Sequence, residues 1–452
     1  MKKKNDAENS TKSGMTRRSF IGKTSLAAAA ITIVPRHVLG GQGYKAPSDT
    51  LNIACIGIGG KGKSDSAAME SENVVALCDV DEIRGKDTRL KYPSARFYED
   101  FRVLFDKEKN IDAVTISTPD HNHAVIALWA MQRGKHVYVQ KPLTHTVREA
   151  RILAKAAKKY NIVSQMGNQG HAGEGARLVN EWIADDAIGD VHEVHTWTNR
   201  PIWPQGNLER PEAIPSVPNY LNWNQWIGPA PYRPYHPAYH PFKWRGWWDF
   251  GTGALGDMGA HILDQPFWAL DLDFPDTVVA TSTPYSDETY PQASIVTWTF
   301  PEKDGRDPVK IVWYDGGLLP PRPVELEPGR KMGSCIYYGS DGMLMHNTYG
   351  DSPRLIPETA MKEYDLPEKT IPRSPGIYKE WIDAIKNGGK STTDFEYSAK
   401  LTEMMLLGNI AIKMKDKDTI LEYDGNKGEF TNVDEANEYL DTKHAKGFEV
   451  EL

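Results

Sequence analysis

From Leu51 onward, short runs of apolar and β-branched residues alternate with stretches whose apolar residues recur at helical spacing. This alternation is typical of a parallel sheet whose strands are joined by helices. The strand-like runs are residues 51–56, 74–78, 113–117, 136–139 and 162–166, and the helix-like stretches are 64–69, 82–90, 124–133 and 147–158. The pattern predicts a doubly wound α/β domain over residues 50–168.

The pattern changes after Gly170. Residues 191–198, 277–281, 294–300, 309–314 and 335–338 are strand-like, and residues 175–184, 257–270, 377–386 and 397–414 are helix-like. This order favours a second domain of α+β type over residues 169–452, with an antiparallel or mixed sheet. We expect the polar tail from Lys415 to wrap the surface.

A segment dense in proline and aromatic residues, 201–250, interrupts this second pattern. Seven of the thirteen tryptophans lie between Trp197 and Trp248. Aromatic rings stack on the flat faces of sugars, so Trp203 and Trp244 are candidates for substrate contact. The alternative is that most of these rings build a small core of their own or a subunit interface.

The overall charge argues against nucleic acid as a partner. The chain of 452 residues has a formal net charge of −8, and basic residues are concentrated only near its start. This distribution offers no footprint for phosphate backbones or anionic lipid. The three cysteines cannot form a disulfide framework, so we expect free thiols. A small molecule is the expected partner.

The first residues are interpreted as an export signal. Residues 16–23 contain Arg17-Arg18 followed by Phe20 and Lys23, the spacing of twin-arginine signals, and an apolar run follows at 24–34. That run is about half of the roughly 20 residues that span a bilayer, so stable membrane insertion is not expected. We predict a signal over residues 1–41 and a periplasmic or otherwise exported protein, with a disordered basic tail as the alternative.

Residues 57–62 read Gly-Ile-Gly-Gly-Lys-Gly directly after a predicted strand and before a helix. In that context glycines let the backbone approach a pyrophosphate at the helix N-terminus. Asp79 follows twenty-two residues after Gly57 and could accept hydrogen bonds from a ribose 2′-hydroxyl while repelling a 2′-phosphate, which favours NAD over NADP. The alternative is a glycine turn beside an ordinary surface aspartate. The glycines assigned to the cofactor are Gly57, Gly59, Gly60 and Gly62.

Another polar cluster follows the predicted strand at 113–117. Ligands of such sheets bind at the carboxyl ends of the strands, so polar groups here could contact the nicotinamide ribose. Capping of a helix by Asp120 or Asn122 is an alternative, and it is compatible with that role. The residues assigned to the cofactor here are Thr118, Pro119, His121 and His123.

Four motifs together resemble the Gfo/Idh/MocA family of oxidoreductases. They are the glycine loop, Thr118-Pro119, Gln140-Lys141-Pro142 and residues 256–261, Gly-Asp-Met-Gly-Ala-His. The resemblance covers roughly residues 51–414 and implies a Rossmann domain, a second domain with an open-faced sheet, and action on sugars or polyols. It also implies homo-oligomers, often dimers or tetramers formed through that sheet. Gln140 departs from the family, which usually has glutamate there, and we assign it with Lys141 to the cofactor.

Asp257 and His261 are four residues apart in a helical stretch, so their side chains share one face. A carboxylate beside an imidazole can hold its tautomer and raise its basicity, which suits removal of a proton from an alcohol. Lys141, just past a strand end, can stabilise an alkoxide as hydride leaves. With the family motifs we assign His261 as general base, Asp257 as its partner or a substrate hydrogen bonder, and Lys141 as electrostatic helper and proton relay. An ordinary solvated Asp-His pair is the alternative.

Further candidates lie where the two predicted domains meet. Asn168 is assigned to the cofactor, and Gln169, His171 and Asp264 to the substrate, although Gly167 and Gly170 also fit a simple turn. No metal site is predicted: His236 and His240 have a spacing of four, but the proline between them breaks any helix.

These observations predict an NAD-dependent oxidation of a secondary hydroxyl on a sugar or glycoside. An exported enzyme meets little free NAD, so the cofactor is expected to be loaded before export, held tightly and recycled within the site. Oxidation at carbon 3 of a glycoside also permits elimination of the aglycone, which makes an NAD-dependent glycoside-cleaving enzyme the first alternative. A non-catalytic sugar-binding protein is the second.

Overall fold

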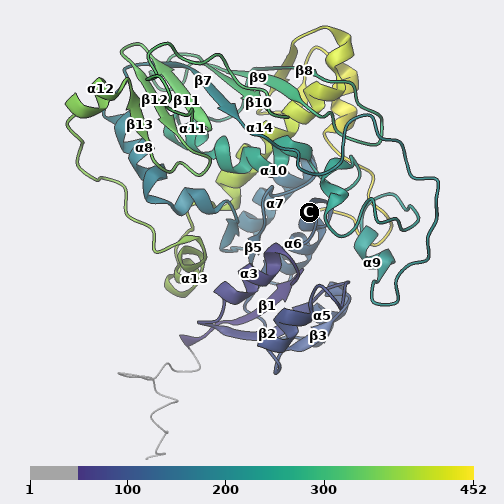
Figure 1. The fold of residues 1–452 in the computed structure, drawn as a ribbon. Helices are drawn as coiled ribbons and strands as arrows, with labels where there is room; N and C mark the ends of the chain where they lie inside the picture. The colour runs from purple at the N-terminus through teal and green to yellow at the C-terminus, as the bar shows by residue number, and fades with distance from the viewer. Residues whose placement is uncertain (1–48) are drawn as a thin grey trace, which may run out of the picture. The chain divides into compact units, whose positions relative to one another are not determined.

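The computed structural model describes residues 49–452 (Figure 1). The predicted twin-arginine signal lies outside the described residues. Residues 51–452 form one compact unit. In the described part of the chain, no helix has both the length and the apolar character needed to cross a membrane.

Six parallel strands form the first sheet, in the order β3-β2-β1-β4-β5-β6. Four of them are nearly continuous apolar runs, as expected for strands buried on both faces. The strands are β1 (Asn52–Ile56), β2 (Asn73–Cys78), β3 (Arg96–Tyr98), β4 (Ala113–Ile116), β5 (His136–Val139) and β6 (Ser164–Met166). This is the predicted doubly wound arrangement.

Helices cover both faces of this sheet, and one of them comes from far along the chain. Helices α5 (Phe101–Lys107), α6 (His123–Met131) and α7 (Val147–Lys159) pack on one face. On the other face, Ile377, Trp381 and Ile382 of α13 (Ile377–Asn387) pack against Ile53 and Tyr138. Helices α3 (Lys61–Ala68) and α4 (Lys86–Lys91) follow β1 and β2. The sheet is therefore completed by a segment that lies more than two hundred residues after its last strand.

The second sheet has nine strands in the order β13-β12-β11-β7-β10-β9-β8-β14-β15. Only β7 and β10 pair in parallel; the other neighbours are antiparallel. The α/β class and the mixed, mostly antiparallel second sheet agree with the sequence-based expectation. The strands are β7 (Val191–Trp197), β8 (Thr277–Ser282), β9 (Ser294–Phe300), β10 (Val309–Tyr314), β11 (Cys335–Gly339), β12 (Met343–His346), β13 (Arg354–Ile356), β14 (Leu421–Asp424) and β15 (Glu429–Phe430).

Helix α14 (Phe395–Lys413) joins the two sheets into one unit (Figure 1). It packs against α7 on the first sheet and against β8 and β9 of the second. Gly408 permits this approach, because a Cβ there would lie 2.7 Å from the ring of Trp298. The tail after Lys415 does more than wrap the surface, since β14 pairs with β8 and extends the sheet.

The predicted helix at 257–270 is two helices, α10 (Gly253–Ile262) and α11 (Asp264–Ala269). Pro266 has no N–H to donate to the Ile262 carbonyl, so one helix cannot continue through this point. The remaining helices are α8 (Glu174–Ala184), α9 (Trp223–Ile227) and α12 (Glu358–Glu363). The three cysteines are buried and free, as expected.

Candidate active site

A cavity of about 390 Å³ opens at the carboxyl ends of the first sheet's strands, within the usual size range of ligand sites. It has two ends, which we call the Asp79 end and the Lys141 end after the residue that lies at each. Many of the residues assigned from the sequence line it. They are Gly57, Gly59, Gly60, Asp79, Thr118, Pro119, Gln140, Lys141, Trp244 and Asp257.

The glycine loop connects β1 to α3 and is shaped by close backbone approaches. A Cβ on Gly57, where φ is +74°, would lie 2.7 Å from the Ser117 carbonyl, and one on Gly62 would lie 1.7 Å from the Gly57 oxygen. Gly62 is therefore required for packing and does not line the cavity. The backbone of the loop lines the cavity next to the N-terminus of α3, as a pyrophosphate site requires.

Asp79 follows β2 and supports this loop directly. Its Oδ2 accepts hydrogen bonds from the N–H groups of Ile58 (2.8 Å) and Gly59 (3.1 Å), and its Oδ1 accepts one from Asp81 (2.9 Å). The carboxylate thus fixes the loop while facing the cavity. Its contact with a ribose hydroxyl remains a prediction.

A roof segment, residues 217–250, covers the Asp79 end. The Val80 carbonyl accepts a hydrogen bond from Asn222 N–H (2.8 Å), and the Tyr220 carbonyl accepts one from Glu82 N–H (3.0 Å). His240 Nε2 lies 2.7 Å from Asp81 Oδ2. The roof residues Trp226, His240, Pro241 and Phe242 line the cavity opposite the sheet. A segment from the second domain thus closes over the strand end that carries Asp79.

The roof segment has its own aromatic core, as one interpretation of the sequence predicted. Trp223 and Trp226 stack with ring centroids 4.6 Å apart, and Tyr239, Trp247 and Phe250 pack around them. The Trp247 indole donates to the Ala238 carbonyl over 2.9 Å, so the segment is also bonded to itself. These rings hold the roof together and are buried from solvent.

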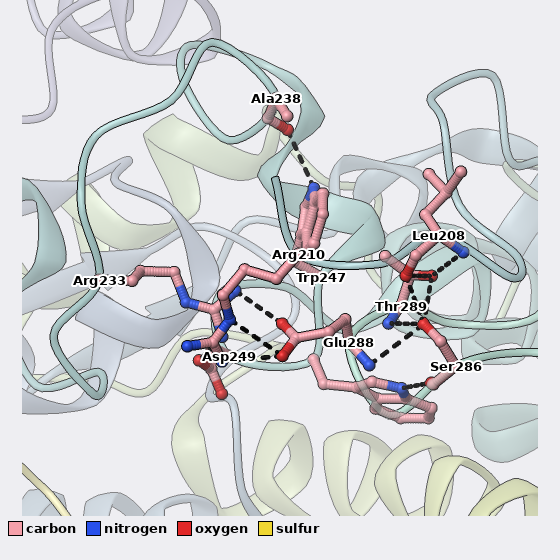
Figure 2. A network of polar contacts seen from close by, with 10 residues as sticks. Leu208, Arg210, Arg233, Ala238, Trp247, Asp249, Ser286, Glu288 and Thr289 are labelled. Atoms are coloured by element: carbon pink, nitrogen blue, oxygen red, sulfur yellow. Dashed lines mark hydrogen bonds and ion pairs between the residues drawn. The ribbon is translucent and has the colours of Figure 1, made fainter. Parts of the chain in front are cut away.

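An ionic network anchors the roof at its base (Figure 2). The buried Arg233 guanidinium pairs with Asp249 and with Glu288 (2.9 Å), and Arg210 pairs with the same Glu288 (2.8 Å). Ser286, two residues before Glu288, bonds to the Leu208 carbonyl. The loop before β9 therefore holds two distant parts of the aromatic segment.

At the Lys141 end, two cations surround one carboxylate. Lys141 Nζ donates to Asp257 Oδ1 (2.9 Å) and to the Asp257 carbonyl (2.5 Å), while Arg245 Nε lies 3.4 Å from the same Oδ1. Burial raises the pKa of Asp257, but Lys141 and Arg245 outweigh it and lower that pKa to about 2. The cluster keeps a net positive charge, which suits stabilisation of an alkoxide.

Arg245 lines the cavity and was not identified from the sequence. Its guanidinium lies over the ring of Trp244 at 4.3 Å and over that of Phe242 at 4.7 Å. It lies in the roof segment, over one hundred residues from Lys141. A single arginine among many aromatics carries no local signal for this contact.

His261 lies one turn beyond Asp257 on α10, and the carboxylate raises its pKa less than its other surroundings lower it. Burial and Lys141 lower the pKa of His261 to about 3, although Asp257 acts in the opposite direction. Asp257 therefore acts on His261 in the expected direction, but burial and Lys141 outweigh it and the imidazole is not made more basic overall. The imidazole is neutral near pH 7, and its ring meets Tyr349 edge-on at 5.0 Å.

Several assigned residues have buried polar atoms that lack partners in residues 49–452. They are Thr118 Oγ1, His261 Nδ1 and both side-chain atoms of Asn168, which is fully buried. Buried polar atoms are almost always hydrogen-bonded, to protein, water or ligand. Thr118 lines the cavity, whereas Asn168 and His261 are not among its lining residues. With the glycine loop and Asp79, the Thr118 hydroxyl belongs to a donor and acceptor set that fits a dinucleotide.

Two histidines assigned to the cofactor lie behind the cavity wall. His121 Nδ1 lies 3.1 Å from the Phe250 carbonyl and Nε2 lies 3.0 Å from the Trp226 carbonyl; burial lowers the pKa of His121 to about 4, so only one of the two nitrogens donates. His123 bonds to the carbonyls of Pro142 (2.8 Å) and Thr118 (2.9 Å). Both connect loops and do not line the cavity.

The residues assigned to the substrate are only partly brought together. His171 Nδ1 lies 3.1 Å from Asp264 Oδ1 in a buried cluster, where Tyr397 also donates to Asp264 (2.7 Å), and neither lines the cavity. Gln169 lies in a separate surface depression. Trp203 is buried, and its indole N–H donates a hydrogen bond to Gln205 Oε1 (2.7 Å). Of the two assigned tryptophans, only Trp244 lines the cavity.

Comparison with known proteins gives the family. Residues 51–168 match the model described as oxidoreductase family, NAD-binding Rossmann fold, and residues 191–450 match the C-terminal alpha/beta domain of the same family, GFO_IDH_MocA. This chain belongs to that family. It therefore binds NAD through the first sheet, as the glycine loop and Asp79 indicated.

Two sequence relatives of the chain are named as enzymes that act on sugars. Levoglucosan dehydrogenase of Pseudarthrobacter phenanthrenivorans is 28% identical over 48% of this chain and 50% of its own length. Alpha-N-acetylgalactosaminidase of Shewanella oneidensis is 27% identical over 44% of this chain and 51% of its own length. The chain thus matches about half the length of each of these two relatives.

Among solved structures, levoglucosan dehydrogenase in complex with NADH and levoglucosan has the same fold. Its TM-score is 0.56 at 18% identity, over 82% of this chain and 99% of the other. This likeness concerns the arrangement of the two sheets.

Proposed function

We propose that this protein oxidises a secondary hydroxyl of a sugar or glycoside by hydride transfer to an NAD that it holds tightly. The observation that carries the chemistry is the Lys141–Asp257–Arg245 cluster, which places positive charge in the cavity that also contains the glycine loop. Relatives named for levoglucosan and for a galactosaminide support a carbohydrate substrate.

Lys141, Asp257 and His261 have distinct tasks in this proposal. NAD, held by the glycine loop and Asp79, would supply the acceptor for the hydride of the carbinol carbon. Lys141 donates a hydrogen bond to the substrate oxygen and stabilises its developing negative charge, while Asp257 keeps the ammonium in place. The neutral His261 is assigned the hydroxyl proton, although burial and Lys141 lower its pKa to about 3 and make it a weak base.

The roof segment supports the retention of NAD. It bonds to three residues directly after β2, including the His240–Asp81 pair, so a dinucleotide at Asp79 would be covered by it. Retention also agrees with the proposed export through the twin-arginine route, because an exported enzyme must carry its cofactor. We propose periplasmic or other exported localisation on the basis of Arg17 and Arg18.

The composition of the purified protein tests retention. We expect close to one NAD per chain in the supernatant after denaturation, measured by absorbance and mass spectrometry. A protein that is purified empty and requires millimolar NAD for turnover would refute retention. For export, Arg17→Lys with Arg18→Lys should move the protein from the periplasmic to the cytoplasmic fraction, and an unchanged distribution would exclude the twin-arginine route.

A glycoside-cleaving reaction is the second candidate, favoured by the relative named as an alpha-N-acetylgalactosaminidase. In this case transient oxidation acidifies the neighbouring carbon, which loses its proton as the aglycone is eliminated. Water then adds to the resulting unsaturated ketone, and the hydride returns to the carbonyl carbon of the sugar. A glycoside labelled in both parts separates the two by mass spectrometry. Accumulating keto-glycoside supports the oxidoreductase, whereas released aglycone without a keto product supports cleavage.

A non-catalytic sugar-binding protein is the third candidate. It is excluded if sugar binding in the wild type is accompanied by a change in nicotinamide absorbance that His261→Asn abolishes while sugar affinity stays measurable. We further propose a homo-oligomer, to be measured by light scattering of the full chain.

A further inference from the structure

Asp65 is a fully buried carboxylate beneath the glycine loop, and the catalytic proposal does not use it. It lies on α3, whose buried side consists of Gly62, Asp65 and Ser66 in place of large apolar residues. A buried charge is costly unless it is paired and hydrogen-bonded. Its position at the carboxyl ends of β4 and β5 therefore requires a reason.

Each oxygen of Asp65 accepts two hydrogen bonds. Oδ1 accepts from the Lys61 ammonium and from the Tyr378 hydroxyl (2.7 Å), and Tyr378 in turn accepts from Lys61 (2.8 Å). Oδ2 accepts from the Ser117 hydroxyl (2.7 Å) and from Gln140 Nε2 (2.9 Å). An ionised carboxylate can only accept, and these four donors fill its capacity.

This arrangement determines which way the Gln140 carboxamide faces. Its NH₂ group must face Asp65, because an amide oxygen at the same position would be repelled by the carboxylate oxygen and could not donate a hydrogen bond to it. The side chain also crosses Gly167, where a Cβ would lie 2.8 Å from Nε2. Gln140 lines the cavity beside Lys141, and no partner for its Oε1 is found within residues 49–452. The oxygen is thus left as an acceptor.

We propose that Asp65 is a positioning residue for the dinucleotide: it holds the Gln140 carboxamide with its oxygen available to the nicotinamide half of NAD. That half carries ribose hydroxyls and a carboxamide NH₂, which are hydrogen-bond donors. Dinucleotides lie across the strand ends of such sheets, with the adenosine near the strand that carries the ribose-binding carboxylate. Gln140 lies beyond β1 and β4 from Asp79, on the nicotinamide side. The inference rests on NAD binding and is independent of the sugar chemistry proposed above.

Moving the carboxylate from one residue to the other provides the test. In Asp65→Asn, the oxygen of the introduced carboxamide stays with Lys61 and Tyr378, so its NH₂ faces Gln140 and turns that side chain round. In Gln140→Glu, two carboxylates oppose each other. In the double variant, the introduced NH₂ at position 65 donates to the introduced carboxylate at position 140, whose second oxygen again offers an acceptor.

The measured quantity is the rate at which NADH leaves the loaded protein, followed by its fluorescence after excess NAD is added. We expect each single variant to release NADH about tenfold faster, the effect of losing one well-placed hydrogen bond. The double variant should return to within about threefold of the wild type. A double variant that releases NADH as fast as the worse single variant would overturn the proposal.

Two further variants separate positioning from simple loosening. Gln140→Met keeps Asp65 but removes the acceptor, so it should accelerate release as Asp65→Asn does, and it keeps the test decisive if Asp65→Asn fails to fold. Tyr378→Phe removes a donor on the side of Asp65 away from Gln140. It should lower the melting temperature of the apoprotein and leave NADH release unchanged. Release rates that follow melting temperature across all variants would show a structural role only and refute positioning.

Discussion

The two ends of the cavity differ in how far the protein satisfies its own polar groups. At the Asp79 end, the carboxylate accepts three backbone N–H groups and the roof segment pairs with the residues that follow it. At the Lys141 end, Thr118, Asn168 and His261 have buried polar atoms without partners in the described residues. Most polar groups at the Asp79 end are bonded between two parts of the chain, with His240 Nδ1 and Gln225 Oε1 as exceptions within residues 49–452, whereas three residues near the Lys141 end leave hydrogen bonds for ligands to make.

This difference indicates a division of labour. Groups that are already bonded can hold a shape but have little left to offer a reacting atom, whereas unsatisfied groups cost stability until a ligand arrives. Retention of NAD should therefore depend mainly on the Asp79 end, with the Gln140 carboxamide contributing from the other side, and turnover on the Lys141–Asp257 pair. Substitutions at the two ends should affect different measurements.

The largest expected effect is on turnover. Lys141→Met should lower kcat about a thousandfold, because the substrate oxygen loses its cationic hydrogen-bond donor. Bound NADH should be released at close to the wild-type rate, since both the Asp79 end and the Gln140 carboxamide are untouched. Lys63→Met, on the exposed surface of α3, is the matched control and should retain full kcat. Equal kcat in the two variants would remove Lys141 from the chemistry.

The next effect concerns release of the cofactor. His240→Phe keeps an aromatic ring against Trp226 but removes the bond to Asp81, so NADH should leave about thirtyfold faster while kcat at saturating NAD is kept. Stopped-flow fluorescence measures the release rate. His236→Phe, in the same segment, is the control and should leave the rate unchanged, because within residues 49–452 the His236 side chain hydrogen-bonds only to the Ala238 N–H.

A third effect appears in the pH dependence of stability. Because the pKa of Asp257 falls from 3.8 to about 2 on folding, its ionised form stabilises the protein by about 2 kcal/mol above pH 4, and this contribution is lost as the pH falls through 2. Urea unfolding of wild type and Asp257→Asn should therefore differ most above pH 4 and converge toward pH 2. A constant difference over this range would contradict the assignment.

The smallest effect distinguishes two tryptophans that look equivalent in the sequence. Trp244 lines the cavity, so Trp244→Phe should raise KM for the sugar a few-fold, about the value of one aromatic contact. Trp203 is buried outside the cavity, and Trp203→Phe should lower the melting temperature without changing KM. The reverse pattern would place the sugar elsewhere.

The sequence predicted most strands of both sheets to within two residues, because β-branched runs such as β4, β9 and β10 carry a strong local signal. It did not predict β3, with three residues, or β12 to β15, whose runs are short and partly polar. Such strands form because they pair with the edge of a neighbouring strand. Their pairing is not encoded in their own pattern.

The site shows the same limit. The glycine loop, Asp79, Lys141 and Asp257 follow from motifs with fixed local geometry, and all of them line one cavity. The His240–Asp81 pair is a contact over more than one hundred residues, and Arg245 reaches Asp257 across twelve residues of irregular chain and helix start; neither contact follows from a local motif. Asp65 had a weak signal, a polar face on a helix that must pack against a sheet.

The late arrival of α13 has a consequence for biosynthesis. Ile53, Cys55, Leu77 and Tyr138 are covered by Ile377, Trp381 and Ile382, which the ribosome adds more than two hundred residues after the sixth strand. Until then, one face of the nucleotide-binding sheet lacks its apolar cover. A nascent chain that stops at residue 168 would expose that face to chaperones and to other chains. The nucleotide-binding half can thus complete its fold only when nearly the whole protein has left the ribosome.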